Sequence, residues 1–325
     1  MKAIHVTKFG GSEHMILAEA ERPVPAAGEV LIRVKAASVN FADIKARYGK
    51  KGGGPLPYIP GIDCTGTIEA LGNGVEGLIP GQRVIAFPSK GSYAEHAVAP
   101  AMLTFPIPEN ISDIQAAALP IAGITSLKLL EEVARIQHGE TVLIHAGAGG
   151  VGTTAIQLAR ILGAGKVIAT AGSPEKTAYA MEAGADYAAC YTKEDFQVNV
   201  MEWTEGKGAD VILDSVAGAV TEKSLDCLAP FGRLVNFGNA SGKAGTVQTS
   251  DLHSSCRSLL GFSFGMVRKK KPHLVKASAE KIIGLLETGR LRMKIGKTFS
   301  LAEAAEAHNR IESRQSMGKT ILIID

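Results

Sequence analysis

The sequence has few of the features that would indicate a disulfide-stabilised, secreted or membrane-spanning protein. Its four cysteines, at positions 64, 190, 227 and 256, lie too far apart for the close pairs of zinc clusters or small disulfide scaffolds. No run approaches the roughly eighteen apolar residues of a membrane helix, and the first residues lack the apolar region of a signal peptide. We therefore expect reduced, packed thiols in a soluble, cytoplasmic protein.

Aromatic residues and net charge are also low, and this narrows the classes of function. Only 5% of the residues are aromatic, and the 35 basic residues nearly balance the 32 acidic ones. The net charge of +3 calls for neither a nucleic acid nor a membrane as partner. A length of 325 residues exceeds the usual size of a single core, which predicts two domains.

The pattern of predicted secondary structure changes near residue 112. Before it, short β-like runs such as Glu29 to Lys35 and Val84 to Phe87 predict a compact, largely β domain. A capping-box pattern at Ser112 to Gln115 then opens a long helical region. After it, strands alternate with helices as in a parallel, doubly wound sheet. The strands are expected at residues 141–145, 166–170, 187–191, 209–214 and 233–237, with a helix at 150–162.

Two features near the C-terminus complete this outline. The run from Arg268 to Lys271 is basic and is expected to be an exposed loop rather than an RNA contact. It precedes two more helical patterns. The final apolar run, Thr320 to Ile324, is expected to be a strand that returns to the first domain.

The segment from His145 to Gly152 follows a predicted strand and opens a predicted helix, which is the context of a dinucleotide-binding loop. A pyrophosphate must approach backbone N–H groups at a helix N-terminus, and a nearby Cβ would hold it away. Gly147 suits the turn, Gly149 and Gly150 admit the phosphates beside Val151, and Gly152 allows the helix to pack on its strand. His145 itself is expected to be a satisfied core histidine.

The residues after the second strand of this region indicate the cofactor. Folds that bind NAD usually place an acid about 20 residues downstream of the loop to hold the ribose hydroxyls. This chain instead places Ser173 as a helix cap before Pro174, with Lys176 facing the ribose, which suits a 2′-phosphate. Glu175 is expected to complement the helix dipole, and Lys176 as a merely solvated charge remains the alternative. The predicted cofactor is NADP(H).

Ordered motifs along almost the whole chain resemble the quinone oxidoreductase and zeta-crystallin branch of the medium-chain dehydrogenase/reductase superfamily. The matching segments are residues 38–43, 59–61, 123–125, 145–152, 214–216, 237–242 and 312–314. The resemblance implies an α/β protein with a GroES-like, mostly β catalytic domain at residues 1–120 and 266–325. A doubly wound, parallel-sheet Rossmann domain that binds NADP would occupy residues 121–265.

The same resemblance implies the cofactor site. Asn40 and Thr125 would border the nicotinamide. The residues implied to surround the adenosine 2′-phosphate are Ser173, Lys176, Tyr191 and Arg314. The remaining implied cofactor ligands are Ser215, Phe237, Gly238 and Asn239. A homodimer through the Rossmann domain is also implied, and the apolar segment from Ser258 to Phe262 could add an edge strand across its two-fold axis.

Metal ligands are missing where zinc-dependent members of the superfamily carry them. Those members have a cysteine at the position of Asn40 and a histidine at that of Ile62, and many hold a cluster of four cysteines for a structural zinc. We therefore expect no metal. Without a Lewis acid, hydride addition to a quinone or an activated alkene remains feasible.

Three side chains are candidates for the chemistry. Asn40 could donate to the substrate oxygen or the nicotinamide ribose, or it could only stabilise its loop. Thr125 is the second candidate. Tyr48 is a possible proton donor, but Lys45 stands where the tyrosine of quinone reductases is usual, so protonation by solvent is the default. Asp43 is expected to brace nearby backbone N–H groups.

Taken together, these residues predict a zinc-independent, NADPH-dependent reductase of a quinone, an enone or an alkenal. An enoyl-thioester reductase is the alternative among enzymes, because the sequence does not reveal the shape of the pocket. A non-catalytic NADPH-binding protein, crystallin-like or RNA-binding, is the alternative from another class.

Overall fold

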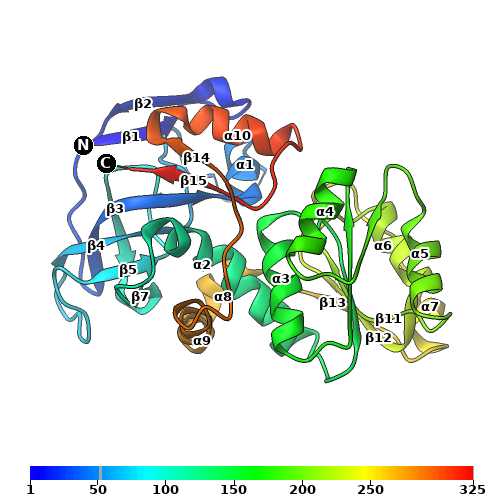
Figure 1. Ribbon diagram of the computed structural model, residues 1–325. Helices are drawn as coiled ribbons and strands as arrows, with labels where there is room; N and C mark the ends of the chain where they lie inside the picture. The colour runs from blue at the N-terminus through cyan, green and yellow to red at the C-terminus, as the bar shows by residue number, and fades with distance from the viewer. Residues whose placement is uncertain (51–52, 325) are drawn as a thin grey trace. The chain divides into compact units, whose positions relative to one another are not determined.

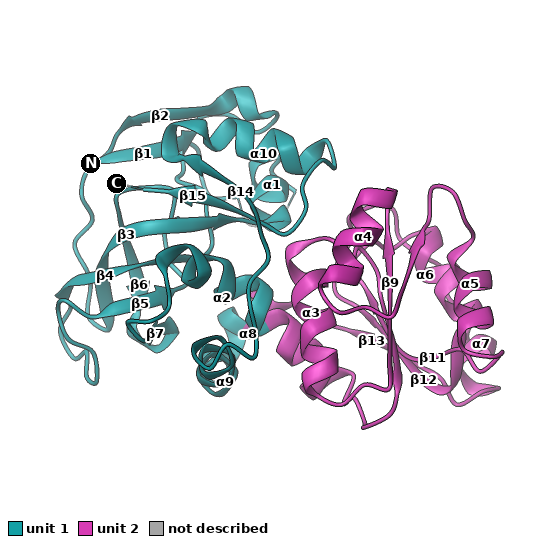
Figure 2. Cartoon of the chain, in the orientation of Figure 1, with its two compact units in different colours: residues 1–124, 268–325 teal, residues 125–267 magenta. Residues whose placement is uncertain are grey.

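The computed structural model describes residues 1–50 and 53–324, and the chain forms two compact units (Figure 2). Unit 1 comprises residues 1–124 and 268–325, and unit 2 comprises residues 125–267. Two helices, α2 (Asp113–Lys128) and α8 (Phe264–Lys270), carry the chain from one unit into the other. The hydroxyl of Ser112 accepts the amide N–H of Gln115 at 3.4 Å, so the predicted cap does begin α2.

Unit 1 is built around one long strand, β3 (Glu29–Val39), which crosses a mixed seven-stranded sheet (Figure 1). The order β14-β15-β3-β4-β5-β7 has β6 paired with β3 as well. The other strands of this sheet are β4 (Cys64–Leu71), β5 (Arg83–Ala86), β6 (His96–Pro100), β7 (Thr104–Pro106), β14 (Ile295–Ser300) and β15 (Lys319–Ile323). Strands β1 (Lys2–Val6) and β2 (Met15–Glu19) form a separate antiparallel pair.

The C-terminal strand belongs to unit 1, which confirms the predicted return of the chain. Strand β15 pairs antiparallel with β3, with Thr320 opposite Val39. Its side chains join a core that β3 and β4 also supply. The helical elements of this unit are α1 (Phe41–Arg47), α9 (Val275–Glu287), α10 (Ala304–Glu312), η1 (Ser12–His14), η2 (Ala101–Leu103), η4 (Pro272–Leu274) and η5 (Leu301–Glu303).

Unit 2 contains a six-stranded, all-parallel sheet in the order β10-β9-β8-β11-β12-β13, which confirms the predicted doubly wound sheet. The strands are β8 (Thr141–Ile144), β9 (Lys166–Ala171), β10 (Tyr187–Cys190), β11 (Ala209–Asp214), β12 (Leu228–Asn236) and β13 (Ser258–Gly261). The chain reverses its direction of winding between β8 and β11, and ligands of such sheets bind at the carboxyl ends of the strands near this point.

Helices cover both faces of this sheet. Figure 1 shows α3 and α4 on one side, and α5, α6 and α7 on the other. Their bounds are α3 (Gly150–Ile161), α4 (Pro174–Glu182), α5 (Phe196–Trp203), α6 (Ala219–Asp226) and α7 (Thr249–His253), with a π-helical turn η3 (Leu129–Val133) after α2. Because both faces are covered, the middle strands are almost wholly apolar, as β8 and β11 illustrate.

The interpretation of residues 268–271 as a loop was wrong for residues 268–270, although Lys269, Lys270 and Lys271 are exposed as expected. Arg268, Lys269 and Lys270 form the last turn of α8, because the first strong helix breaker after them is Pro272. Arg268 turns inward, and its guanidinium lies 4.8 Å from the centre of the Phe87 ring. Within the described ranges, no helix is both long enough and apolar enough to cross a membrane.

Candidate functional site

The glycine loop of unit 2 joins the end of β8 to the start of α3. A Cβ on residue 152 would lie 2.3 Å from the carbonyl oxygen of Ala146, and a Cβ on residue 147 would lie 2.7 Å from the Cβ of Ala169. Only glycine therefore permits this tight passage from strand to helix. The first backbone N–H groups of α3, beginning at Gly150, have no acceptor within their own helix and offer an anion site.

The buried side chain of His145 supports this loop. The residue is 2% exposed, with Nδ1 of its ring 2.9 Å from the Thr170 hydroxyl and Nε2 2.9 Å from the Ser224 hydroxyl. Burial lowers the pKa of His145 to about 4, so the ring is neutral at physiological pH. The prediction of a satisfied core histidine is confirmed.

The segment after β9 gathers three of the predicted phosphate ligands. Ser173 caps α4 by accepting the amide N–H of Lys176 at 3.4 Å, as predicted. The Tyr191 hydroxyl lies so close to residue 172 that a Cβ there would be 2.7 Å from it. Ser173, Lys176 and Tyr191 thus lie together at the carboxyl ends of β9 and β10. Glu175 bonds to Ser173, which lowers the pKa of its carboxyl and keeps it at the helix terminus.

The ends of β11 and β12 bring together the next group of predicted ligands. The amide N–H of Ala240 donates to the carbonyl of Ser215 at 3.0 Å, and a Cβ on Gly238 would lie 2.5 Å from that same oxygen. Asp214 holds this loop, since its carboxylate accepts the amide N–H of Val216 at 2.7 Å. Ser215 therefore lies beside residues 237–239. The role of Asp214 was not predicted, although an acid that ends an apolar strand and precedes a glycine turn is a usable signal.

Thr125 lies at the start of unit 2 and is 6% exposed. The hydroxyl of its neighbour Ser126 donates to the carbonyl of Val151 at 3.1 Å, which places this part of α2 against the glycine loop. Arg314 belongs to unit 1, where it follows α10 in the left-handed backbone region with φ of 57°.

Asn40 is the centre of a buried polar cluster in unit 1. Its Nδ2 donates to Oδ1 of Asp63 at 2.9 Å and to the carbonyl of Ser38 at 3.3 Å. Its Oδ1 accepts the ammonium of Lys319 at 2.7 Å. Both amide hydrogens have acceptors within unit 1, so this geometry favours the loop-stabilising role over donation to a substrate.

Asp63 and Lys319 form the charged part of this cluster, and neither was predicted. Asp63 accepts the Ser38 hydroxyl at 2.7 Å and the amide N–H of Ile121 at 3.1 Å. Burial raises the pKa of the Asp63 carboxyl and lowers that of the Lys319 ammonium, while each charge acts on the other in the opposite direction. The sequence did offer one signal for Lys319: it is the charged residue directly before the apolar strand run that begins at Thr320, and a charge at such a position can be buried and paired.

Asp43, in the first turn of α1, is the last member of this cluster. Its Oδ2 accepts the amide N–H of Asn40 at 2.9 Å, which confirms that it braces a backbone N–H group. The Tyr93 hydroxyl lies 3.4 Å from the same oxygen. Burial, followed by the nearby Asp63 charge, raises the pKa of Asp43 to about 7.

Tyr48 lies at the other end of α1, as its C-cap, and is 41% exposed. Its ring packs on the guanidinium of Arg47, with 4.8 Å between the Arg47 Cζ and the ring centre. A hydrogen bond to Glu312 raises the pKa of the Tyr48 hydroxyl, which makes it a weaker acid. These contacts direct Tyr48 toward α10.

The residues at the positions of the zinc ligands do not fit a catalytic zinc. Ile62 is aliphatic, and the Asn40 oxygen is already bonded to an ammonium. In the part of the chain that the structure describes, no group of three histidine, cysteine, aspartate or glutamate side chains could hold a metal ion.

Family models match both units of the chain. The model of the alcohol dehydrogenase GroES-like domain matches residues 26–109, and the model of the zinc-binding dehydrogenases matches residues 150–280. A quinone oxidoreductase of Pseudomonas aeruginosa is 37% identical over 329 residues, which cover 99% of each chain. A 2-haloacrylate reductase of a Burkholderia species is 32% identical over 98% of this chain and 97% of the relative.

A solved structure extends the likeness to three dimensions. The crystal structure of the quinone oxidoreductase of Escherichia coli, complexed with NADPH, is 32% identical and superposes with a TM-score of 0.93. The match covers 99% of this chain and 100% of that one. The protein is therefore an oxidoreductase with a GroES-like domain and a Rossmann domain that binds NAD(P). It belongs to the quinone oxidoreductase branch of the medium-chain dehydrogenase/reductase superfamily.

Proposed function

We propose that this protein uses NADPH to reduce a quinone, or an alkene conjugated to a carbonyl group, and that it does so without zinc. The observation that carries the proposal is the gathering of Ser173, Lys176 and Tyr191 at the start of α4. Relatives named for quinone reduction and for haloacrylate reduction support the two kinds of acceptor.

The geometry after β9 supports NADPH rather than NADH. A 2′-phosphate would meet a helix N-terminus, a capping hydroxyl and the ammonium of Lys176, all of which favour a doubly negative group. The carboxylate of Glu175 bonds to Ser173, so it serves the helix terminus. We also propose Arg314 as a second cation for this phosphate.

The residues of the chain would bind and orient the reactants. The glycine loop would hold the pyrophosphate, while Thr125 and the loop of Asn40 would border the nicotinamide. Bound NADPH would supply the hydride. The oxygen of the acceptor gains negative charge as the hydride arrives, and solvent would provide its proton.

A panel of acceptors tests this function. Oxidation of NADPH and of NADH would be followed with quinones, enones, a 2-haloacrylate and enoyl thioesters, each at several concentrations. We expect the highest kcat/KM with NADPH and a quinone or a carbonyl-conjugated alkene. A clear preference for enoyl thioesters would favour the alternative enzyme, and no turnover with any acceptor would refute the proposal.

A further inference from the structure

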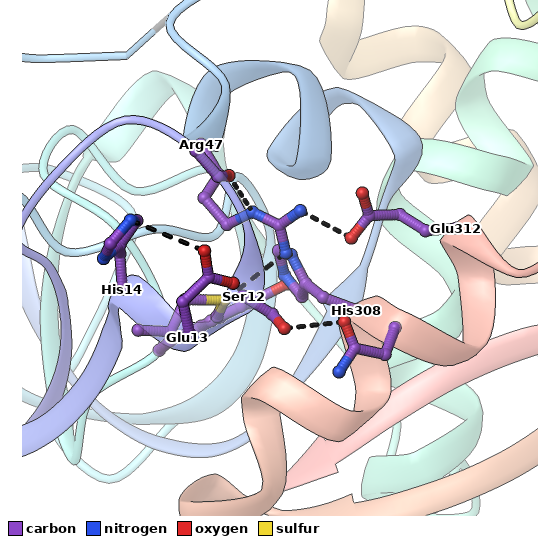
Figure 3. A network of polar contacts seen from close by, with 10 residues as sticks. Ser12, Glu13, His14, Arg47, His308 and Glu312 are labelled. Atoms are coloured by element: carbon purple, nitrogen blue, oxygen red, sulfur yellow. Dashed lines mark hydrogen bonds and ion pairs between the residues drawn. The ribbon is translucent and has the colours of Figure 1, made fainter.

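A chain of hydrogen bonds runs through the interior of unit 1 and ends on Asp43. Arg47 is fully buried, and its guanidinium bonds to Glu312 at 2.5 Å and lies 3.4 Å from Nδ1 of His308 (Figure 3). The other ring nitrogen of His308, Nε2, lies 3.3 Å from the Tyr93 hydroxyl. That hydroxyl in turn lies 3.4 Å from Oδ2 of Asp43. The chain links α10 to α1 through one tyrosine.

Elementary hydrogen-bond chemistry fixes the direction of this chain. A guanidinium can only donate, so Nδ1 of His308 must accept and carries no proton. Burial and the Arg47 charge lower the pKa of His308 to about 3, so the ring is neutral and its proton resides on Nε2. Nε2 then donates to the oxygen of Tyr93, and the Tyr93 hydroxyl is left to donate to Asp43.

Asp43 holds the backbone of Asn40 with the same oxygen. Oδ2 accepts both the Asn40 amide N–H and the Tyr93 hydroxyl, whereas the buried Oδ1 has no partner among the described residues. A carboxylate that accepts two hydrogen bonds on one oxygen is stabilised in its ionised form. The proton of the neutral form would therefore reside on Oδ1.

Three charged groups act on Asp43. The cations are Lys319 of β15 and Arg268 of α8, and the acid is Asp63. Tyr58 is the second tyrosine near Asp43, since burial and then the Asp43 charge together raise its pKa to about 12. Unlike Tyr93, the buried Tyr58 hydroxyl has no partner among the described residues.

We propose that Tyr93, oriented by His308 and Arg47, is a positioning residue for hydride transfer, because it holds the Asp43 carboxylate on the backbone of the Asn40 loop. The inference rests on the proposed function for the role of that loop. It adds that the productive loop geometry needs ionised Asp43, because Oδ2 of a neutral carboxyl group accepts the Asn40 N–H more weakly than a charged oxygen does. Activity should then fall in acid as Asp43 gains its proton.

The test is Tyr93→Phe, read out by two independent titrations. The first is the pH dependence of kcat/KM for the best acceptor. The second is the carboxyl resonance of Asp43 in protein labelled with [γ-13C]aspartate, assigned by its loss in Asp43→Asn. Loss of the Tyr93 hydroxyl destabilises the ionised carboxylate, so both midpoints should move to higher pH, by about one to two pH units.

Matched variants separate the hydrogen bond from a general loss of packing. Tyr58→Phe also removes a buried hydroxyl near Asp43, but one without a hydrogen bond, and should leave both midpoints in place. His308→Gln retains one acceptor for Arg47 and one donor for Tyr93, and should also preserve them. His308→Leu breaks the chain one step away and should raise both midpoints by less than Tyr93→Phe does. It keeps the test open if Tyr93→Phe does not fold.

Each other outcome contradicts the proposal in a distinct way. Unchanged midpoints in Tyr93→Phe, or equal movement in Tyr58→Phe, would refute the directed chain. If the Asp43 resonance moves while the midpoint of kcat/KM stays, the chain exists but does not serve the reaction. If the wild-type protein reduces no acceptor, the proposed function fails and the positioning role fails with it, while the resonance still reports the chain.

Discussion

Replacement of Lys176 by alanine isolates the contribution of one ammonium to the choice of cofactor. The Ser173 cap accepts the backbone N–H of residue 176, so it survives the change, and alanine is the best helix former. A charge-assisted hydrogen bond contributes about 1.5 to 3 kcal/mol, and solvent screening at this half-buried position reduces it to about 1.4 kcal/mol. The KM for NADPH should therefore rise about tenfold.

Steady-state kinetics with both cofactors checks this reasoning. NADH has no 2′-phosphate, so its kinetics should be nearly unchanged in Lys176→Ala. Lys207→Ala serves as the control, because Lys207 is highly exposed and lies far along the chain in another turn. Equal losses for NADPH and NADH would mean that Lys176 is structural. A wild-type preference for NADH would refute the assignment of NADPH and would indicate that Glu175 binds the ribose hydroxyls instead.

Four further outcomes are expected. The free energy of unfolding should fall as the pH drops from about 6.5 to about 4, because the lowered pKa of His145 lets the unfolded chain bind a proton before the folded one does. His145→Gln should remove up to about 3 kcal/mol of that fall, measured by urea unfolding at both ends of the range. Tyr48→Phe should keep kcat within about twofold, whereas a loss of about a hundredfold would identify Tyr48 as the proton donor. Active protein should contain no stoichiometric zinc by elemental analysis, and a loss of turnover with chelators would contradict the zinc-free assignment. Light scattering at micromolar concentration should give a homodimer, with the edge strand β13 as the expected contact, and a monomer would argue against it.

Local chemistry explains which parts of the fold could be predicted from the sequence. Gly147 and Gly152 are required by the backbone within a few residues of themselves, and Ser173 caps the helix that Pro174 begins. The apolar strands of unit 2 are buried on both faces, so their runs are unambiguous. The basic run misled because charge does not distinguish a loop from the last turn of a helix, and because the partly buried Arg268 places its guanidinium over the Phe87 ring.

Long-range contacts explain what could not be predicted. Lys319 bonds to Asn40 across 279 positions of the sequence, and His308 meets Tyr93 across 215. No spacing rule connects such residues, because their contact depends on the pairing of β15 with β3 and on the packing of α10. The roles of Asp63, Lys319 and Tyr93 therefore emerged only from the folded chain.

The cluster around Asn40 also bears on the kind of acceptor that this protein can reduce. The Lys319 ammonium donates to Asn40 and to the carbonyl of Val39, so its charge is used to hold the loop. It therefore does not replace the Lewis acid that a zinc ion provides in related dehydrogenases. An unactivated ketone would need such polarisation, whereas a quinone or a carbonyl-conjugated alkene spreads the incoming charge over its own π system. The residues at positions 40, 62 and 319 thus support the proposal that the acceptors are electron-poor before they bind.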